Sequence, residues 1–135
     1  MKRLKMFTAL LACSFEVASQ TLTNNEFTTT FPAEANGDVV QLVTGYVVLS
    51  FTNVATGKSL SATLSGPGTT VFLPDGSVTA SAEGPSVLIL VPGDIPSGPS
   101  FVINYGQYVV NISPRGQFIV QKQTGAQFDV CAALS

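Results

Sequence analysis

Apolar and polar residues alternate along much of the chain, with a period of two residues. The segment LSATL, residues 60–64, alternates strictly, and EFTTTF, residues 26–31, places Phe27, Thr29 and Phe31 on one face. Successive side chains of a β-strand point to opposite faces, so this period is typical of strands. No segment shows the period of about 3.6 residues that marks an amphipathic helix. The pattern therefore predicts a chain of strands with almost no helix beyond the first dozen residues.

Residues that favour turns separate these strands. Asn36-Gly37, the sequence PDGS at residues 74–77 and the sequence SPRGQ at residues 113–117 each predict a tight connection, because Asn, Asp and Gly readily adopt turn conformations. The run SVLILV, residues 86–91, is apolar at successive positions, which is typical of a central strand buried on both faces. Turn signals recur about every 8–12 residues, as they do in sandwiches and barrels. We therefore predict one antiparallel β-sandwich, immunoglobulin-like or related, over residues 13–135.

The same pattern assigns the outermost strands and the core. The first and last strands are expected at residues 13–22 and 127–133, and Gly45 predicts a bulge or bend in the long run at residues 39–54. One face of each strand is expected to point inward. The predicted core side chains are Phe15, Val17, Leu49, Phe51, Leu60, Leu64, Val78, Leu88, Leu90, Val109 and Val120.

The composition agrees with a single folded domain. Hydrophobic residues make up 45% and charged residues 10% of the 135-residue chain, whereas charged residues make up about 25% of an ordinary globular protein. This balance excludes a disordered chain and a coiled coil. The formal net charge of −2 provides no basic surface for nucleic acid. No apolar run approaches the roughly 20 residues of a membrane-spanning helix, so we expect no membrane span.

The first twelve residues differ from the rest of the chain. Basic residues in the first five positions precede the apolar segment MFTALLA, an arrangement typical of a secretory signal. We therefore treat residues 1–12 as a signal-like or non-domain segment without a strand. Four alternatives remain open: a shortened signal or misplaced start codon, a lipoprotein signal in which LLAC makes Cys13 a lipid anchor, cleavage after Ser19, and an unprocessed mature segment.

The chain contains two cysteines, Cys13 and Cys131. A disulfide between them would close a loop of nearly the whole chain, which the chain-entropy model values at roughly 4–5 kcal/mol of stability. It would also keep the last strand from fraying. The residues alone fit two unrelated thiols equally well, because spacing does not prove connectivity. A disulfide persists only in an oxidising compartment, so the pairing bears on where the protein resides.

Five motifs along the domain form a recognisable set. They are CSFEV at residues 13–17, TNVATGKS at residues 52–59, SGPG at residues 65–68, PDGSVT at residues 74–79 and the terminal DVCAALS at residues 129–135. Together they resemble small exported proteins of actinobacteria with no assigned function. Those proteins typically open the domain with Cys-Gly-Phe-Pro-Val and close it with Asp-Val-Cys-Ala-Leu-Leu, whereas Ser14 and Glu16 replace the glycine and proline here. The resemblance implies an extracellular all-β domain in which Cys13 pairs with Cys131, and it implies no reaction.

The residue types exclude several kinds of chemistry. The sequence contains no histidine, which excludes Ser-His-Asp and Cys-His catalysis and metal sites that require histidine. The sequence TGKS, residues 56–59, is followed by a strand pattern rather than a helix. A hairpin turn with Gly57 at positive φ is therefore favoured over a phosphate-binding loop.

The carboxylates are scattered. Glu34, Asp38, Asp75 and Asp94 all fall in predicted turns and are expected to be solvated. A small hydrolase that uses paired carboxylates would need two of them about 5–10 Å apart across a cleft. No segment has the spacing of a calcium-binding loop. We therefore expect neither a metal nor another cofactor.

The best candidate for a binding element is the loop PGDIPSGPS, residues 92–100. Its prolines restrict the backbone, so Asp94, Ile95 and Pro96 would be presented on a rigid loop. The alternative is a stiff connection between strands with no binding role. Tyr105 and Tyr108 lie nearby, and their odd spacing predicts one tyrosine in the core and one at the surface.

These observations predict a non-catalytic extracellular or cell-surface module with a binding or structural role. Its partner would be a protein or a carbohydrate. The alternatives are a small carboxylate-dependent hydrolase and a surface lipoprotein anchored at Cys13.

Overall fold

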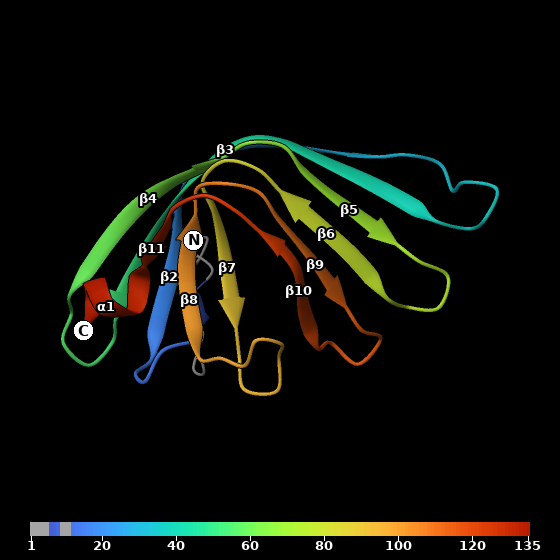
Figure 1. The fold of residues 1–135 in the computed structure, drawn as a ribbon. Helices are drawn as coiled ribbons and strands as arrows, with labels where there is room; N and C mark the ends of the chain where they lie inside the picture. The colour runs from blue at the N-terminus through green and yellow to red at the C-terminus, as the bar shows by residue number, and fades with distance from the viewer. Residues whose placement is uncertain (1–5, 9–11) are drawn as a thin grey trace.

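The computed structural model describes residues 6–8 and 12–135. Within them the chain forms eleven strands and one short helix, and the antiparallel strands build sheets that pack together (Figure 1). The predicted all-β sandwich is confirmed. In chain order the elements are β1 (Met6–Thr8), β2 (Val17–Thr30), β3 (Val39–Asn53), β4 (Ser59–Ser65), β5 (Gly68–Phe72), β6 (Val78–Ala82), β7 (Ser86–Leu90), β8 (Ser100–Asn104), β9 (Tyr108–Ile112), β10 (Phe118–Gln123), β11 (Gln127–Asp129) and α1 (Val130–Leu134).

The two sheets differ in size. The larger one runs β1-β2-β3-β5-β6-β9-β10, with β4 also paired to β3, and the smaller one runs β11-β8-β7. Figure 1 shows β4 and α1 at one side of the molecule, whereas β5, β6, β9 and β10 fan out at the other side. β7 is apolar on both faces as predicted, but it lies at the edge of the smaller sheet rather than at a sheet centre.

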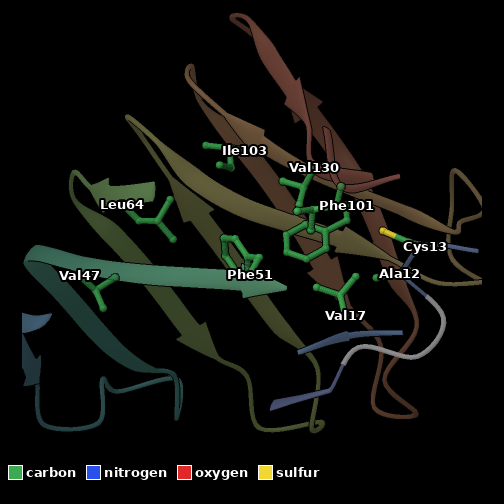
Figure 2. Close-up of a cluster of buried hydrophobic side chains, with 10 residues drawn as sticks. Ala12, Cys13, Val17, Val47, Phe51, Leu64, Phe101, Ile103 and Val130 are labelled. Atoms are coloured by element: carbon green, nitrogen blue, oxygen red, sulfur yellow. The ribbon is translucent and has the colours of Figure 1, made fainter. Parts of the chain in front are cut away.

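The main core lies between the two sheets. Phe51 on β3 and Phe101 on β8 meet edge to face, with ring centroids 5.0 Å apart and an interplanar angle of 81°. Figure 2 shows both rings with Val17 beside them and the Cys13 sulfur at the margin of the same cluster. A second, smaller cluster joins β7 to β9 and β10; its buried members are Leu88, Leu90 and Val110.

Glycines mark the points where the chain passes from one sheet to the other. Gly84-Pro85 separates β6 from β7 and Gly106 separates β8 from β9, and the two strands of each pair belong to different sheets. β4 and β5 pair with the same edge of β3 in one register, interrupted at Gly66-Pro67. A Cβ at Gly66 would clash with the Glu83 carbonyl oxygen. Neighbouring backbones therefore approach each other at this bend more closely than a side chain permits.

A bulge in β2 reverses which of its residues face outward. The register against β3 shifts at Leu22, so Val17 before the bulge is buried, whereas Phe27 and Phe31 beyond it are exposed. The two phenylalanines share one face, as predicted. Gly45 on β3, where the sequence predicts a bulge or bend, adopts a φ of 94°, but the bulge itself lies on β2. We call residues 24–46, the part of the β2–β3 hairpin beyond the bulge, the arm; its tip extends past β5 and β6 (Figure 1).

Most of the predicted core residues are buried. Fully buried are Val17, Phe51, Leu64, Leu88 and Leu90. Partly buried against these clusters are Phe15, Leu49, Leu60 and Val120, and Val78 is also half-buried. Val109 is half-buried too, but the prediction that it faces the core is wrong. Val110 packs against Leu88 and Leu90, while Val109 pairs with Ser81 on the opposite face of β9.

The chain ends differ from the expected strands. The last strand ends at Asp129, whose side chain accepts a hydrogen bond of 3.0 Å from the Ala132 amide and so caps α1. Cys131 therefore lies on a helix, and Cys13 precedes the first long strand, which begins at Val17. Part of the N-terminal segment forms the strand β1, paired with β2, where no strand was expected. The signal and lipoprotein interpretations concern residues 1–12, of which residues 1–5 and 9–11 lie outside the described residues.

Candidate functional site

The two cysteines form a disulfide. The bond joins Cys13 to Cys131 across a sequence separation of 118 residues, with the Cα atoms 5.5 Å apart. The pairing that the resemblance implies is confirmed. The buried Asn53 side chain also donates a hydrogen bond of 3.0 Å to the Leu134 carbonyl oxygen. The two contacts fix α1 against the segment that precedes β2 and against the end of β3, which gives the disulfide a structural role.

An open cleft of about 410 Å³ lies between β7 and the inner face of β6, β9 and β10. Its walls are predominantly apolar, with side chains from all four strands and from the start of the loop that follows β7. Its lining residues are Ala80, Val87, Leu88, Ile89, Val91, Asp94, Tyr108, Val110, Gly116 and Phe118. We call this cavity the cleft. Two of the five predicted binding residues, Asp94 and Tyr108, line it.

Asp94 is the only charged side chain among these lining residues, and it is 6% exposed. Its Oδ2 atom accepts a hydrogen bond of 2.7 Å from the Val91 amide, and its Oδ1 atom accepts one of 2.9 Å from the Phe118 amide. The prediction that Asp94 is a solvated turn residue is therefore wrong. Its carboxylate ties the loop to the start of β10, because buried carboxylates need hydrogen-bond donors.

The loop continues as an added edge of the larger sheet. The Ile95 amide donates to the Phe118 carbonyl oxygen, and the Ile95 carbonyl oxygen accepts from the Val120 amide, each at 2.9 Å. Ile95 thus pairs in parallel with Ile119 of β10, while its side chain is exposed. Pro96 follows through a cis peptide bond. The backbone around Asp94 is consequently held by bonds on both sides of the residue.

The two predicted tyrosines lie in different surroundings, as expected. The Tyr108 hydroxyl donates a hydrogen bond of 3.1 Å to the Val87 carbonyl oxygen at the free edge of β7. Burial raises the pKa of Tyr108 above its ordinary value. Tyr105 is exposed at the bend between β8 and β9 and does not line the cleft. The structure therefore brings Tyr108 and Asp94 to one cavity and leaves Tyr105 outside it.

Sequence reasoning missed the apolar walls of the cleft. Ala80, Val110 and Phe118 line it, yet their alternation is the same as that of any core-facing strand residue. No sequence signal separates a side chain that fills a core from one that lines an open cavity. The burial of Asp94 was also not predictable, because the sequence around it is that of an ordinary turn.

The other carboxylates have local roles. In the turn between β5 and β6, Asp75 accepts hydrogen bonds from the Ser77 hydroxyl and amide, and these bonds lower the pKa of Asp75. Asp38 lies at the tip of the arm and accepts from the Asn36 side chain. Gly57 adopts a φ of 78° in the turn before β4, so the hairpin interpretation of residues 56–59 is confirmed.

Smaller cavities also occur among the described residues. One of about 190 Å³ lies at the bend beside Val43, Leu64 and Val87, with Glu26 at its margin. Another of about 170 Å³ lies within the main core beside Phe51 and Phe101. Among the residues described, no group of three or more potential metal-ligating side chains occurs. Likewise, no helix in the described ranges is long and apolar enough to cross a bilayer.

No family model, curated protein or solved structure matches the chain. The likeness to exported actinobacterial proteins therefore stays a prediction. The cleft, the loop that Asp94 fixes to β10 and the disulfide remain the features on which a function can be argued.

Proposed function

We propose that the protein is a non-catalytic extracellular binding module and that its ligand site is the cleft. The observation that supports this proposal is the combination of an open cavity of about 410 Å³, apolar walls and one buried carboxylate. Ligand sites typically enclose about 300–1,000 Å³ and combine apolar walls with a few fixed polar groups. The cleft has this composition, and its rim includes the loop predicted as the binding element.

An extracellular location is supported by the disulfide between Cys13 and Cys131. Such bonds form and persist in oxidising compartments, and the basic and apolar start of the chain is typical of an export signal. A sulfur atom in this disulfide is not available for a lipid. Export of the oxidised protein would therefore exclude anchoring through Cys13.

The non-catalytic assignment rests on the groups that line the cleft. Hydrolysis by paired acids needs two carboxylates across the site, and the described lining residues include only Asp94. Both of its oxygen atoms already accept backbone hydrogen bonds. Tyr108, the other titratable lining residue, has a raised pKa and stays protonated near neutral pH. Neither group is placed to exchange a proton with a substrate.

The experiment that tests the proposal is ligand mapping by NMR on the oxidised protein. Uncharged, cationic and anionic apolar fragments would be titrated while backbone amide shifts are followed. We expect at least one fragment class to shift the amides around Val87, Val110 and Phe118. Shifts confined to the arm or to the β3–β4 turn, or hydrolysis of a glycan or peptide that depends on Asp94, would contradict the proposal.

A matched pair of variants tests the site itself. Ala80 lines the cleft opposite Val110, whereas its neighbour Ser81 pairs with Val109 on the other face of the same strand. The change Ala80→Leu should fill part of the cleft and weaken fragment binding by about tenfold or more, which is the effect of losing contacts worth roughly 1.4 kcal/mol. The control Ser81→Leu should bind as the unaltered protein does.

A further inference from the structure

We infer that the cleft selects a small apolar molecule that carries an ammonium group. This inference rests on the proposed function, because it names the class of ligand for the same site. It follows from a property that the apolar walls do not supply: the one charged lining group, the Asp94 carboxylate, is an acceptor, and the two amides beside it already donate to it.

Among the described residues in the wall of the cleft, no positive side chain compensates the charge of Asp94. The carboxylate is nearly fully buried, and no Lys or Arg occurs among the residues that line the cleft. Arg115 and Lys122, the basic residues of the adjoining β9–β10 hairpin, are exposed. A buried carboxylate without a positive partner is unfavourable, and two backbone hydrogen bonds offset this cost only in part.

The Asp94 carboxylate keeps free capacity to accept hydrogen bonds. An ionised carboxylate has about four acceptor positions, and Asp94 uses two of them, for the Val91 and Phe118 amides. The Tyr108 hydroxyl donates to the Val87 carbonyl oxygen, so it is not a free donor for a ligand. An ammonium group supplies up to three donors and no acceptor, which complements this surface.

The same arrangement disfavours an anion. The amides of Val91 and Phe118 would be the natural donors for a carboxylate or phosphate ligand, but both donate to Asp94. An anionic ligand would therefore meet Asp94 without a compensating donor, and like charges at short distance repel strongly in a desolvated site. The cleft thus distinguishes ligands by charge as well as by apolar contact.

The backbone that carries the Asp94 carboxylate is rigid. Ile95, the next residue, is paired on both its amide and its carbonyl oxygen with β10, and Pro96 restricts the backbone after it. The carboxylate is therefore held in place before a ligand arrives. Groups that are fixed in advance bind more tightly, because little freedom is lost on binding.

The test compares three ligands of equal chain length on the unaltered, oxidised protein: hexylammonium, 1-hexanol and hexanoate. Titration followed by calorimetry and by amide shifts near neutral pH and at low salt should rank them in that order. We expect hexylammonium to bind about tenfold more tightly than 1-hexanol, since hydrogen bonds to charged groups are the stronger ones. Added salt should weaken hexylammonium and leave 1-hexanol unchanged.

The outcomes separate the two proposals. If 1-hexanol or hexanoate binds the cleft as tightly as hexylammonium, the ligand class is wrong while the cleft remains the binding site. If none of the three perturbs the cleft amides, both the ligand class and the assignment of the cleft are overturned.

The variant Asp94→Asn tests whether the charge of Asp94 causes the preference for an ammonium ligand. It removes the charge but also replaces one acceptor with an amide donor that faces a backbone N–H, so its fold is checked first by circular dichroism. In a folded variant the preference for hexylammonium over 1-hexanol should disappear, and a preserved preference would overturn the role of Asp94. If the variant does not fold, the comparison of ligands on the unaltered protein still decides the question.

Discussion

At one end of the long β2–β3 hairpin the Phe51 side chain is 2% exposed and packs against Phe101, whereas Phe27 at the other end is 69% exposed. The sequence alternates at both ends of the hairpin, and at both ends β2 pairs with β3. The difference is the second layer: β7 and β8 cover the inner face of the hairpin at the Phe51 end, and Phe27 faces outward beyond the bulge. Alternation therefore specifies a strand and its faces, but not which face another sheet will cover.

Charge distinguishes the two regions as well. On the outer face of the arm no charged residue occurs among the alternating positions that share the face with Phe27, which are Asn25, Thr29, Phe31, Val40, Leu42, Thr44 and Tyr46. The Asn25 side chain donates a hydrogen bond of 2.7 Å to the Tyr46 hydroxyl across this face. This outer face of the arm is therefore uncharged, whereas the cleft contains a buried carboxylate, Asp94.

The largest expected effect is the loss of the disulfide from the two-layer region. Replacing both Cys13 and Cys131 with serine should lower the free energy of unfolding by roughly 4–5 kcal/mol on the chain-entropy model, because the closed loop spans 118 positions. Urea unfolding of the variant and of the unaltered oxidised protein measures this difference. Amide shifts of the arm should stay unchanged, since the bond lies at the other end of the hairpin.

Two observations would contradict that expectation. A thiol titration that finds two free thiols in the oxidised protein would show that the bond does not form. An unfolding midpoint that is the same in the presence and absence of reductant would show that the bond adds no stability.

The second prediction compares the stability lost when a phenylalanine is removed from the main core and from the arm. Phe101→Ala should destabilise the protein by about 3–5 kcal/mol, because it leaves a cavity beside Phe51 in the main core. Phe27→Ala on the arm should change stability by less than about 0.5 kcal/mol, as exposed substitutions usually do. Both values come from denaturant unfolding. Comparable losses for the two variants would mean that the arm is covered in solution, by another copy or by a partner.

The fold was largely predictable, because its determinants are local. Turn residues such as Asn36-Gly37 and the alternation at residues 60–64 specify hairpins and faces without reference to distant parts of the chain. Leu22 was not predictable as a bulge, since nothing in its neighbourhood distinguishes it from a regular strand residue. The faces of β9 were ambiguous for a related reason: Val109 and Val110 are both suited to a core, and only the position of β7 decides between them.

The candidate site was predictable only in part. The loop around Asp94 was identified from its prolines, but the burial of Asp94 depends on the Phe118 amide, 24 residues away along the chain. Such a contact between a loop and a distant strand is a tertiary property. The Asp129 cap and the helix at the terminus were missed because the alternating residues before Cys131 favoured a longer strand.

The third effect concerns the junction between the two regions. Gly45 lies where the arm begins, at a φ of 94°, and a Cβ there would clash with the Asn25 carbonyl oxygen. Gly45→Ala should therefore cost about 1–3 kcal/mol or somewhat more. The control is Gly57→Ala, which has a similar φ of 78° but no atom within 4 Å of the added Cβ. Thermal and urea unfolding should rank Gly45→Ala as the more destabilising change, and equal effects would mean that the arm adjusts freely at this point.

The smallest expected effect distinguishes Tyr108, in the wall of the cleft, from Tyr46 on the arm. Burial raises the pKa of Tyr108 above the ordinary value of 10.0, so the folded state favours its protonated form. The stability that this preference provides is fully present below about pH 10 and is lost as the pH rises through the folded-state pKa. Tyr108→Phe should remove this alkaline loss, and near neutral pH it should cost about 0.5–1.5 kcal/mol for the hydrogen bond to Val87. Tyrosinate absorbance and urea unfolding, each recorded against pH, measure the two effects.

Tyr46→Phe on the arm is the matched control. It should leave in place the component of the absorbance change that titrates at the highest pH, which we assign to Tyr108. If that component disappears with Tyr46 instead of Tyr108, the buried tyrosine is not the one in the wall of the cleft.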